Sequence, residues 1–297
     1  MKTLLPSCVK LRMQPERQGD EMRDIIIESW DHLLSAVFDG VWDPAIARYR
    51  NNRVFRGMAE YQWGLTPSLN RACPHDLSLE KMILRSFQKY GYAELQSCSS
   101  FWEIVAMGQQ FGLPTRLLDW TYSPLVAAHF ATEDVDSFDR DGAIWCVDIP
   151  RVNEHLPTVL RSRLSEHKGV IFTRDILDEI APDFDALRAY AQKPFAMFFE
   201  PASTVNRIAN QYALFSVVSD PAVTLLDLPE STTFTRLIIS KKAKLEIRDK
   251  LDYINISERM IYPGLDGICK WIARRYAPLG PRYNSAHDEQ TPAPHII

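Results

Sequence analysis

GAIWCVDI, at residues 142–149, is the strongest β-strand pattern in the sequence, a nearly continuous apolar run that Pro150 closes. Before it, TRLLDWT at residues 115–121 also has strand-forming residues at both ends. Pro124 follows and suits the first turn of a helix, because proline in that turn loses no helical hydrogen bond. These segments therefore predict a strand, a helix and a second strand in close succession.

Similar patterns extend outward from this centre. RVFRG, at residues 53–57, is typical of a short strand closed by glycine, and further strands are expected at residues 195–199, 214–218, 223–226 and 236–239. Apolar residues at helical spacing predict helices over residues 25–41, 79–90, 101–110, 241–251 and 267–276, with loops over 58–76 and 151–192. Because helices come early and strands later, without βαβ alternation, we expect an α+β fold with a mixed or antiparallel sheet core and flanking helices.

The chain length suits one main domain with short extensions. We expect an N-terminal arm over residues 1–24, an α+β domain over 25–240, a helical appendage of that domain over 241–276, and a flexible tail over 277–297. The appendage is expected to pack through the apolar residues Leu245, Ile247, Leu251, Ile268, Trp271 and Ile272.

The composition is that of a soluble globular protein, with 46% hydrophobic and 24% charged residues among 297. The formal charge of −4 excludes a globally basic nucleic-acid binder, although it allows a local basic groove. Five scattered cysteines without CxxC spacing argue against a zinc ribbon or a disulfide framework and indicate a reducing, cytoplasmic location. No apolar run is long enough for a signal peptide or a membrane helix.

Familiar catalytic motifs such as GxGxxG, the P-loop, GxSxG and HExxH are absent, so the candidate sites are three polar segments. In the first, Arg56 and Gly57 end a strand, where a guanidinium fork can meet a phosphate or carboxylate. The alternative is a structural arginine that binds loop carbonyls. The third segment places Arg207, Gln211 and Phe215 four residues apart, so they share a face if the segment is helical.

The second segment, residues 112–124, carries several polar groups that are costly to bury without partners. Arg116 and Asp119 suit either a structural ion pair or a ligand contact, and the sequence leaves both open. Ser123 is expected to cap the helix that starts at Pro124. His129, in an apolar helix, fits a packed histidine better than a catalytic base. We predict that Arg56, Arg116, Asp119, Thr121 and Ser123 converge on one cleft.

Together these segments resemble the FRG-domain family, named for a Phe/Tyr-Arg-Gly tripeptide. The resemblance rests on Phe55-Arg56-Gly57, Trp63 with Pro67-Ser68-Leu69, the runs 109–121 and 123–127, the residues Arg207, Gln211 and Phe215, and Ile261-Tyr262-Pro263-Gly264-Leu265-Asp266-Gly267. One departure is Gln110, where many members carry histidine.

The order of elements is more distantly similar to that of ADP-ribosyltransferase folds: a strand ending in arginine, a polar strand, an Ala-x-x-Phe-Ala helix and an apolar strand. This resemblance implies that NAD is the substrate. Its binding residues would be Arg56, Gly57, Arg116, Thr121, Tyr122, Ser123 and Arg207. The catalytic candidates are Asp119, Glu200 and Gln211, and no metal is implied. Gln211 lies where that fold has a glutamate, and a neutral amide stabilises positive charge less well than a carboxylate.

Three functions remain open from the sequence. The first is an enzyme that consumes NAD, either to modify a protein or nucleic acid or to degrade NAD, as a bacterial toxin or antiphage effector would. The second is a non-catalytic module that binds a nucleotide, a nucleic acid or a protein. The third treats the polar motifs as a structural network. None of the three involves a membrane.

Overall fold

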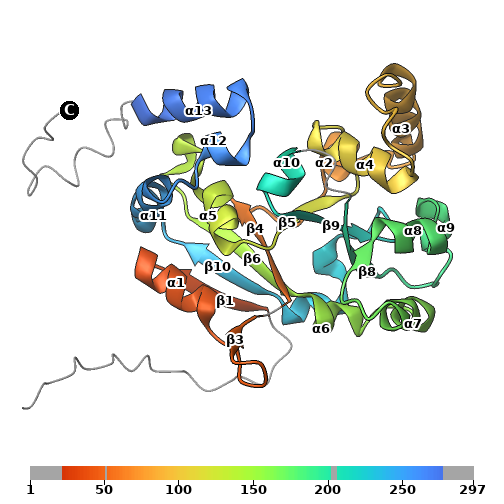
Figure 1. Ribbon diagram of the computed structural model, residues 1–297, viewed down its shortest axis with the longest axis horizontal. Helices are drawn as coiled ribbons and strands as arrows, with labels where there is room; N and C mark the ends of the chain where they lie inside the picture. The colour runs from red at the N-terminus through yellow and green to blue at the C-terminus, as the bar shows by residue number, and fades with distance from the viewer. Residues whose placement is uncertain (1–21, 51, 202–205, 277–297) are drawn as a thin grey trace, which may run out of the picture.

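The computed structural model describes residues 22–50, 52–201 and 206–276 (Figure 1). The tail expected over residues 277–297 lies outside the described residues. So does most of the arm expected over residues 1–24, although Arg23 and Asp24 belong to the first strand. Among the described residues, no helix combines the length and the apolar character that crossing a bilayer requires.

The centre of the fold is an eight-stranded sheet with the order β1-β10-β6-β4-β5-β9-β8-β7. The strands are β1 (Arg23–Ile27), β4 (Arg53–Met58), β5 (Leu118–Thr121), β6 (Gly142–Asp148), β7 (Phe172–Thr173), β8 (Ala196–Glu200), β9 (Ala213–Val218) and β10 (Thr235–Ile239). The pairs β1–β10 and β7–β8 are parallel, and the other neighbours are antiparallel. The expected mixed, mostly antiparallel sheet is therefore confirmed. A separate hairpin pairs β2 (Trp42–Asp43) with β3 (Arg48–Tyr49).

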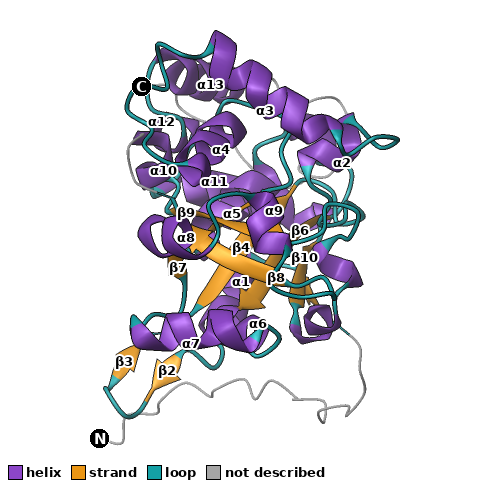
Figure 2. Ribbon diagram, turned by 90° about the vertical axis from the view of Figure 1, so that its right-hand side faces the viewer, coloured by secondary structure: helices purple, strands orange, loops and turns teal. Residues whose placement is uncertain are grey.

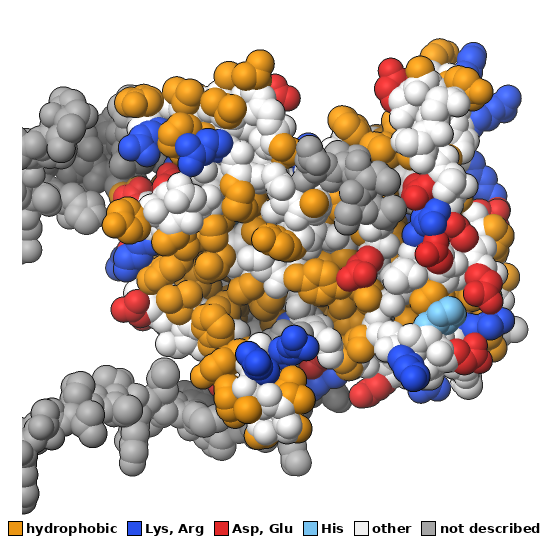
Figure 3. Space-filling view, in the orientation of Figure 1, with side chains coloured by type: hydrophobic (Ala, Val, Ile, Leu, Met, Phe, Trp, Pro, Cys, Tyr) orange, Lys and Arg blue, Asp and Glu red, His pale blue; other side chains and the backbone are white. Residues whose placement is uncertain are grey.

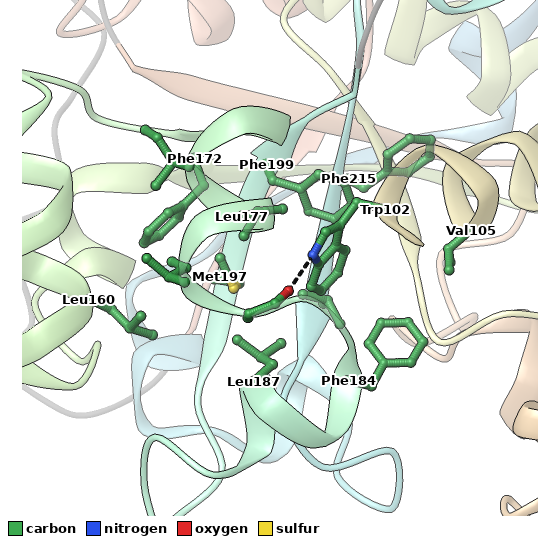
Figure 4. Packing of buried hydrophobic residues seen from close by; sticks show 14 of the residues in the cluster. Trp102, Val105, Leu160, Phe172, Leu177, Phe184, Leu187, Met197, Phe199 and Phe215 are labelled. Carbon is green, nitrogen blue, oxygen red and sulfur yellow. Dashed lines mark hydrogen bonds between the residues drawn. The ribbon is translucent and has the colours of Figure 1, made fainter. Parts of the chain in front are cut away.

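Two groups of helices cover one face of the sheet. Over β1, β10, β6 and β4 lie α1 (Trp30–Phe38), α5 (Pro124–Thr132) and α11 (Lys241–Tyr253). Over β9 and β8 lie α4 (Phe101–Gln110), α7 (Thr158–Glu166), α8 (Arg174–Ile180) and α9 (Phe184–Arg188). In this second cluster the Trp102 indole packs among aromatic rings and donates a hydrogen bond of 2.7 Å to the Ala181 carbonyl (Figure 4).

The opposite face of the sheet is covered by shorter elements. They are α6 (Ile149–Asn153) and the 3-10 turns η2 (Leu225–Asp227) and η3 (Pro229–Thr233). The remaining helices are α2 (Ser68–Ala72), α3 (Leu79–Tyr90), α10 (Asn206–Asn210), α12 (Glu258–Ile261) and α13 (Leu265–Tyr276), with a 3-10 turn, η1 (Val135–Ser137). In Figure 2, α3, α12 and α13 gather at one end of the strands, and the β2–β3 hairpin lies at the other.

The structure corrects four of the expected elements. Residues 58–76 are not all loop, because Ser68–Ala72 form α2. Residues 25–41 are not one helix, because residues up to Ile27 form β1 along β10 and only Trp30–Phe38 is helical. Residues 223–226 are not a strand, since Leu225 starts a 3-10 turn. The stretch 151–192 is not loop-rich, because most of it is helical. Pairing with the distant strand β10 decides β1, whereas a local capping box of Thr224 and Asp227 holds the turn at Leu225.

The appendage also differs from the expectation in its second half. Ile247 and Leu251 of α11 are fully buried, as predicted, but Ile268 and Ile272 of α13 are exposed. Polar contacts hold α13 instead: the Arg274 guanidinium binds the carboxylates of Asp252 and Glu258.

The sheet divides between β4 and β5, which are paired only at Phe55 and Thr121, whereas β4 and β6 are paired along all of β4. On the same face, α5 lies very close to β4, because a Cβ added at Gly57 would meet the Ala127 carbonyl oxygen at 1.8 Å. Glycine is therefore required at this position for α5 to pack on β4.

Candidate functional site

A cavity of about 180 Å³ lies where β4 and β5 part, between α4 and α5. Its lining residues come from these four elements, from α10 and from the residue after α10. They are Phe55, Arg56, Gly57, Gln109, Gln110, Asp119, Trp120, Thr121, Phe130, Arg207 and Gln211. We call this cavity the cleft. Near α10 the molecular surface is hollowed between α13 and α3 (Figures 1 and 3).

Arg56 bridges the two parted strands. Its Nη1 donates a hydrogen bond of 2.6 Å to the Asp119 backbone carbonyl and lies 3.5 Å from the Asp119 carboxylate. Burial lowers the pKa of Arg56 below its ordinary value, against the opposing effect of Asp119. Among the described residues, nothing accepts a hydrogen bond from the buried Nε–H. Arg56 therefore keeps hydrogen-bonding capacity at the cleft.

Asp119 is held from the α4 side. The Gln109 side-chain amide donates a hydrogen bond of 2.8 Å to the Asp119 carboxylate. The other end of that amide accepts a hydrogen bond from the Thr115 hydroxyl, which fixes the orientation of Gln109. Asp119 keeps 39% of its side chain exposed, so its carboxylate still faces solvent in the cleft.

Thr121 ties β5 to the segment that carries Gln211. Its hydroxyl donates a hydrogen bond of 2.7 Å to the Gln211 backbone carbonyl and accepts one of 3.0 Å from the Ser123 amide. The Ser123 side chain caps α5, as predicted, by accepting a hydrogen bond from Val126. Ser123 is consequently used in local structure and does not line the cleft.

Arg207 brings a second guanidinium to the cleft. It extends from α10, and its guanidinium carbon lies 4.9 Å from the centre of the Tyr262 ring. As with Arg56, no described residue accepts from its buried Nε–H. Gln211, one helical turn later, also lines the cleft and is almost fully buried.

Arg116 lies outside the cleft and pairs with a residue that the sequence did not suggest. Its guanidinium binds the buried Glu80 carboxylate of α3 and lies 4.0 Å from the centre of the Phe184 ring. The ion pair considered between Arg116 and Asp119 is thus wrong, as is the predicted convergence of Arg116 and Ser123 on the cleft. Arg56, Asp119 and Thr121 do meet there.

Tyr122 and Glu200 form a separate pair that does not line the cleft. The Tyr122 hydroxyl donates a hydrogen bond of 2.6 Å to the Glu200 carboxylate. Burial raises the pKa of the Tyr122 phenol well above its ordinary value, and the Glu200 contact raises it further. Of the two carboxylate candidates, only Asp119 lines the cleft.

Several cleft residues were not predicted as site residues from the sequence. Gln109 and Gln110 belong to the segment that resembles FRG domains, and this was the signal that could have identified them. Phe130 is the phenylalanine of the Ala-x-x-Phe-Ala helix in the more distant resemblance, but a phenylalanine in an apolar helix is also typical of a core residue. Within the described ranges, no three His, Cys, Asp or Glu side chains are grouped so as to hold a metal ion.

Comparison with known proteins identifies one region of the chain. Residues 51–140 match the family model of the FRG domain. This region runs from the start of β4 past the end of α5, and it includes both Arg56 and Asp119. No curated protein and no solved structure matches the chain. The chain therefore contains an FRG domain over residues 51–140, with the FRG tripeptide at the point where the central sheet divides.

Proposed function

We propose that the cleft binds NAD and releases nicotinamide from it, in a reaction of the ADP-ribosyltransferase type. The observation that carries this proposal is the meeting of Arg56 and Arg207, each with a buried Nε–H that no described residue accepts, beside the Asp119 carboxylate. The acceptor of the ADP-ribosyl group would be water or a macromolecule.

The charges of the cleft favour a ligand that carries phosphate. Two guanidinium groups face one carboxylate, so the lining residues leave one positive charge without a counterion. Guanidinium groups bind phosphate oxygens with paired hydrogen bonds, and such charge-assisted bonds are stronger than those between neutral groups. A pyrophosphate between Arg56 and Arg207 would satisfy both the charge and the free N–H groups.

The same cleft offers an apolar wall for a planar ring at Phe130, whose side chain is partly exposed. Phe55 and Trp120 also line the cleft, but both are almost fully buried in the core. Ligand pockets commonly combine such surfaces with a few polar groups that fix the orientation of the ligand. The nicotinamide or the adenine ring of NAD would suit this wall.

Asp119 is the group that would stabilise the reaction. As the bond between nicotinamide and ribose breaks, positive charge develops on the ribose ring, and a nearby fixed carboxylate lowers the energy of that state. The Gln109 amide holds the Asp119 carboxylate in place without removing its charge. Gln211 would contribute a hydrogen bond to ribose rather than charge.

The arrangement of strands supports the distant resemblance to ADP-ribosyltransferase folds. The arginine-bearing β4, the polar β5, α5 and the apolar β6 follow one another in the chain, and β4 lies between β5 and β6 in the sheet.

One observation favours a non-catalytic alternative. The Asp119 carboxylate already accepts from Gln109 and lies beside Arg56, so part of its charge is compensated. A cleft of this kind would bind a nucleotide without cleaving it. In that case the FRG domain would act as a binding module.

The test is to incubate the purified full chain with NAD, with and without protein or nucleic-acid acceptors, and to measure free nicotinamide. Calorimetry with ADP-ribose measures binding separately. Release of nicotinamide supports the enzyme, and binding without release supports the module. A chain that does not bind ADP-ribose and does not release nicotinamide would contradict both the enzyme and the binding module. If the chain acts as a toxin or antiphage effector, its induced expression should also lower cellular NAD.

Arg56→Lys is expected to weaken ADP-ribose binding by about tenfold while the protein stays folded, because lysine keeps the charge but loses the planar fork. Arg53→Lys is the matched control on the same strand, since Arg53 donates to the Asp39 carbonyl and does not line the cleft. Calorimetry and thermal unfolding check both variants. Unchanged affinity in Arg56→Lys would remove Arg56 from the binding site.

A further inference from the structure

The C-terminal motif Tyr262-Pro263-Gly264, singled out in the sequence, lies beside the part of the chain that carries Arg207 and Gln211. It directly follows α12, which contacts α10. Figure 1 shows α12 next to α10, although the two helices are about fifty residues apart in the chain. The proposed function gives this motif no part in binding.

Helix α10 and Gln211 together form residues 206–211, which we call the α10 segment. Three of its side chains are held by the end of α12. The Asn210 amide donates a hydrogen bond of 2.8 Å to the Met260 carbonyl, and the Gln211 amide donates one of 3.4 Å to the Ile261 carbonyl. The Arg207 guanidinium lies over the Tyr262 ring. Both cleft residues of this segment are thus in contact with residues 261–262.

Tyr262 is itself fixed at its hydroxyl end. The hydroxyl donates a hydrogen bond of 2.9 Å to the Glu133 carboxylate, which also lies 3.2 Å from the buried His129 ring. Burial raises the pKa of Tyr262 well above its ordinary value, and Glu133 raises it further. The hydroxyl therefore remains a donor at physiological pH and adds to the ring contacts with His129 and Phe130 that hold the ring in place.

The ring of Tyr262 also contacts charged and aromatic neighbours. Lys270 Nζ lies 4.7 Å from the centre of the ring, in addition to the Arg207 guanidinium. Phe130, a cleft-lining residue, is in edge contact with the same ring. A guanidinium over a tyrosine ring is held by the negative face of the ring, and the attraction increases where water is excluded.

Gly264 and Gly267, which follow Tyr262 in the chain, explain how Tyr262 is placed. Gly264 has a φ of 106°, a conformation that side-chain-bearing residues rarely adopt, so the chain turns there between α12 and α13. A Cβ added at Gly267 would lie 1.9 Å from the Tyr262 carbonyl oxygen. The first turn of α13 therefore packs directly on the Tyr262 backbone.

We propose that Tyr262 is a positioning residue that holds Arg207 in the cleft, with the end of α12 as the platform for the α10 segment. The positioning rests on these contacts alone, whereas its consequence for NAD rests on the proposed function. Tyr262 does not line the cleft and acts through Arg207.

The test compares Tyr262→Leu, which removes the aromatic face, with Tyr262→Phe, which keeps it. Amide hydrogen exchange of residues 206–211 is measured on the free protein. It is expected to be about tenfold faster in Tyr262→Leu and close to the parent in Tyr262→Phe. Exchange in the Trp102 core should be the same in all three proteins. ADP-ribose affinity should fall about tenfold in the leucine variant alone, as expected for a lost contact of this size.

Parent-like exchange at residues 206–211 in Tyr262→Leu would overturn the proposal. If Tyr262→Leu does not fold, Asn210→Ala replaces it, because this change removes one contact with α12 and leaves Tyr262 in place. Faster exchange at residues 206–211 supports the platform, and parent-like exchange overturns it. A parent protein that binds no ADP-ribose would contradict the proposed function, while the exchange result still decides the positioning.

Discussion

Asp119→Asn is expected to lower nicotinamide release by roughly a hundredfold or more, a typical loss when one preorganised electrostatic contact is removed from a transition state. Asparagine keeps the shape of the side chain and removes its charge. The contact between Arg56 and the Asp119 backbone carbonyl does not depend on the side chain, so the divided sheet should stay intact. The measurement is single-turnover release of nicotinamide, with thermal unfolding to show that the variant is folded.

Glu200→Gln is the matched control for this prediction. Glu200 is the other carboxylate that the sequence suggested, but it binds the Tyr122 hydroxyl and does not line the cleft. Its variant should keep turnover close to that of the parent. Full turnover in Asp119→Asn would remove Asp119 from the chemistry. A large loss in Glu200→Gln instead would place the reaction outside the cleft.

Local sequence patterns predicted much of the sheet because each central strand carries its own signal. All of GAIWCVDI except Ile149 forms β6, and RVFRG forms β4 up to the point where glycine is needed against α5. Edge strand β1 was missed, because Ile25 and Ile27 suit either a helix or a strand. The strand that decides between these, β10, lies more than two hundred residues away.

The candidate site was predictable only where motif residues act within one segment. Ser123 caps the next helix, and this could be read from the order of Ser and Pro. Arg116 could not be placed, because its partner Glu80 lies 36 residues earlier on a separate helix. The apolar spacing of that helix predicted its existence, but a glutamate in its first turn is ordinarily solvent-exposed.

Glu80→Gln is therefore expected to cost about 3–5 kcal/mol of unfolding free energy, the range for removing one partner of a buried ion pair. The Glu80 carboxylate is 2% exposed and accepts from the Arg116 Nε at 2.7 Å, as well as from the Arg116 backbone amide at 3.3 Å. Without it, the Arg116 guanidinium stays buried over Phe184 with only a weak contact to the Ser219 carbonyl. Urea unfolding at equilibrium measures the change.

Lys81→Gln gives a matched control on the next residue of the same helix. Lys81 pairs with Asp185, but both side chains are largely exposed. An exposed pair contributes about 0–1 kcal/mol, so this variant should unfold at nearly the same urea concentration as the parent. Equal losses in Glu80→Gln and Lys81→Gln would contradict the view that burial makes the Glu80–Arg116 pair important.

A double variant separates stability from binding. Glu80→Leu with Arg116→Met replaces the pair by apolar side chains, and such replacements of buried ion pairs are often neutral or stabilising. Because Arg116 does not line the cleft, the double variant should bind ADP-ribose as well as the parent does. If the double variant is as stable as the parent but does not bind ADP-ribose, Arg116 contributes to binding. Retained binding would instead show that Arg116 serves to anchor α3 to the residues just before β5.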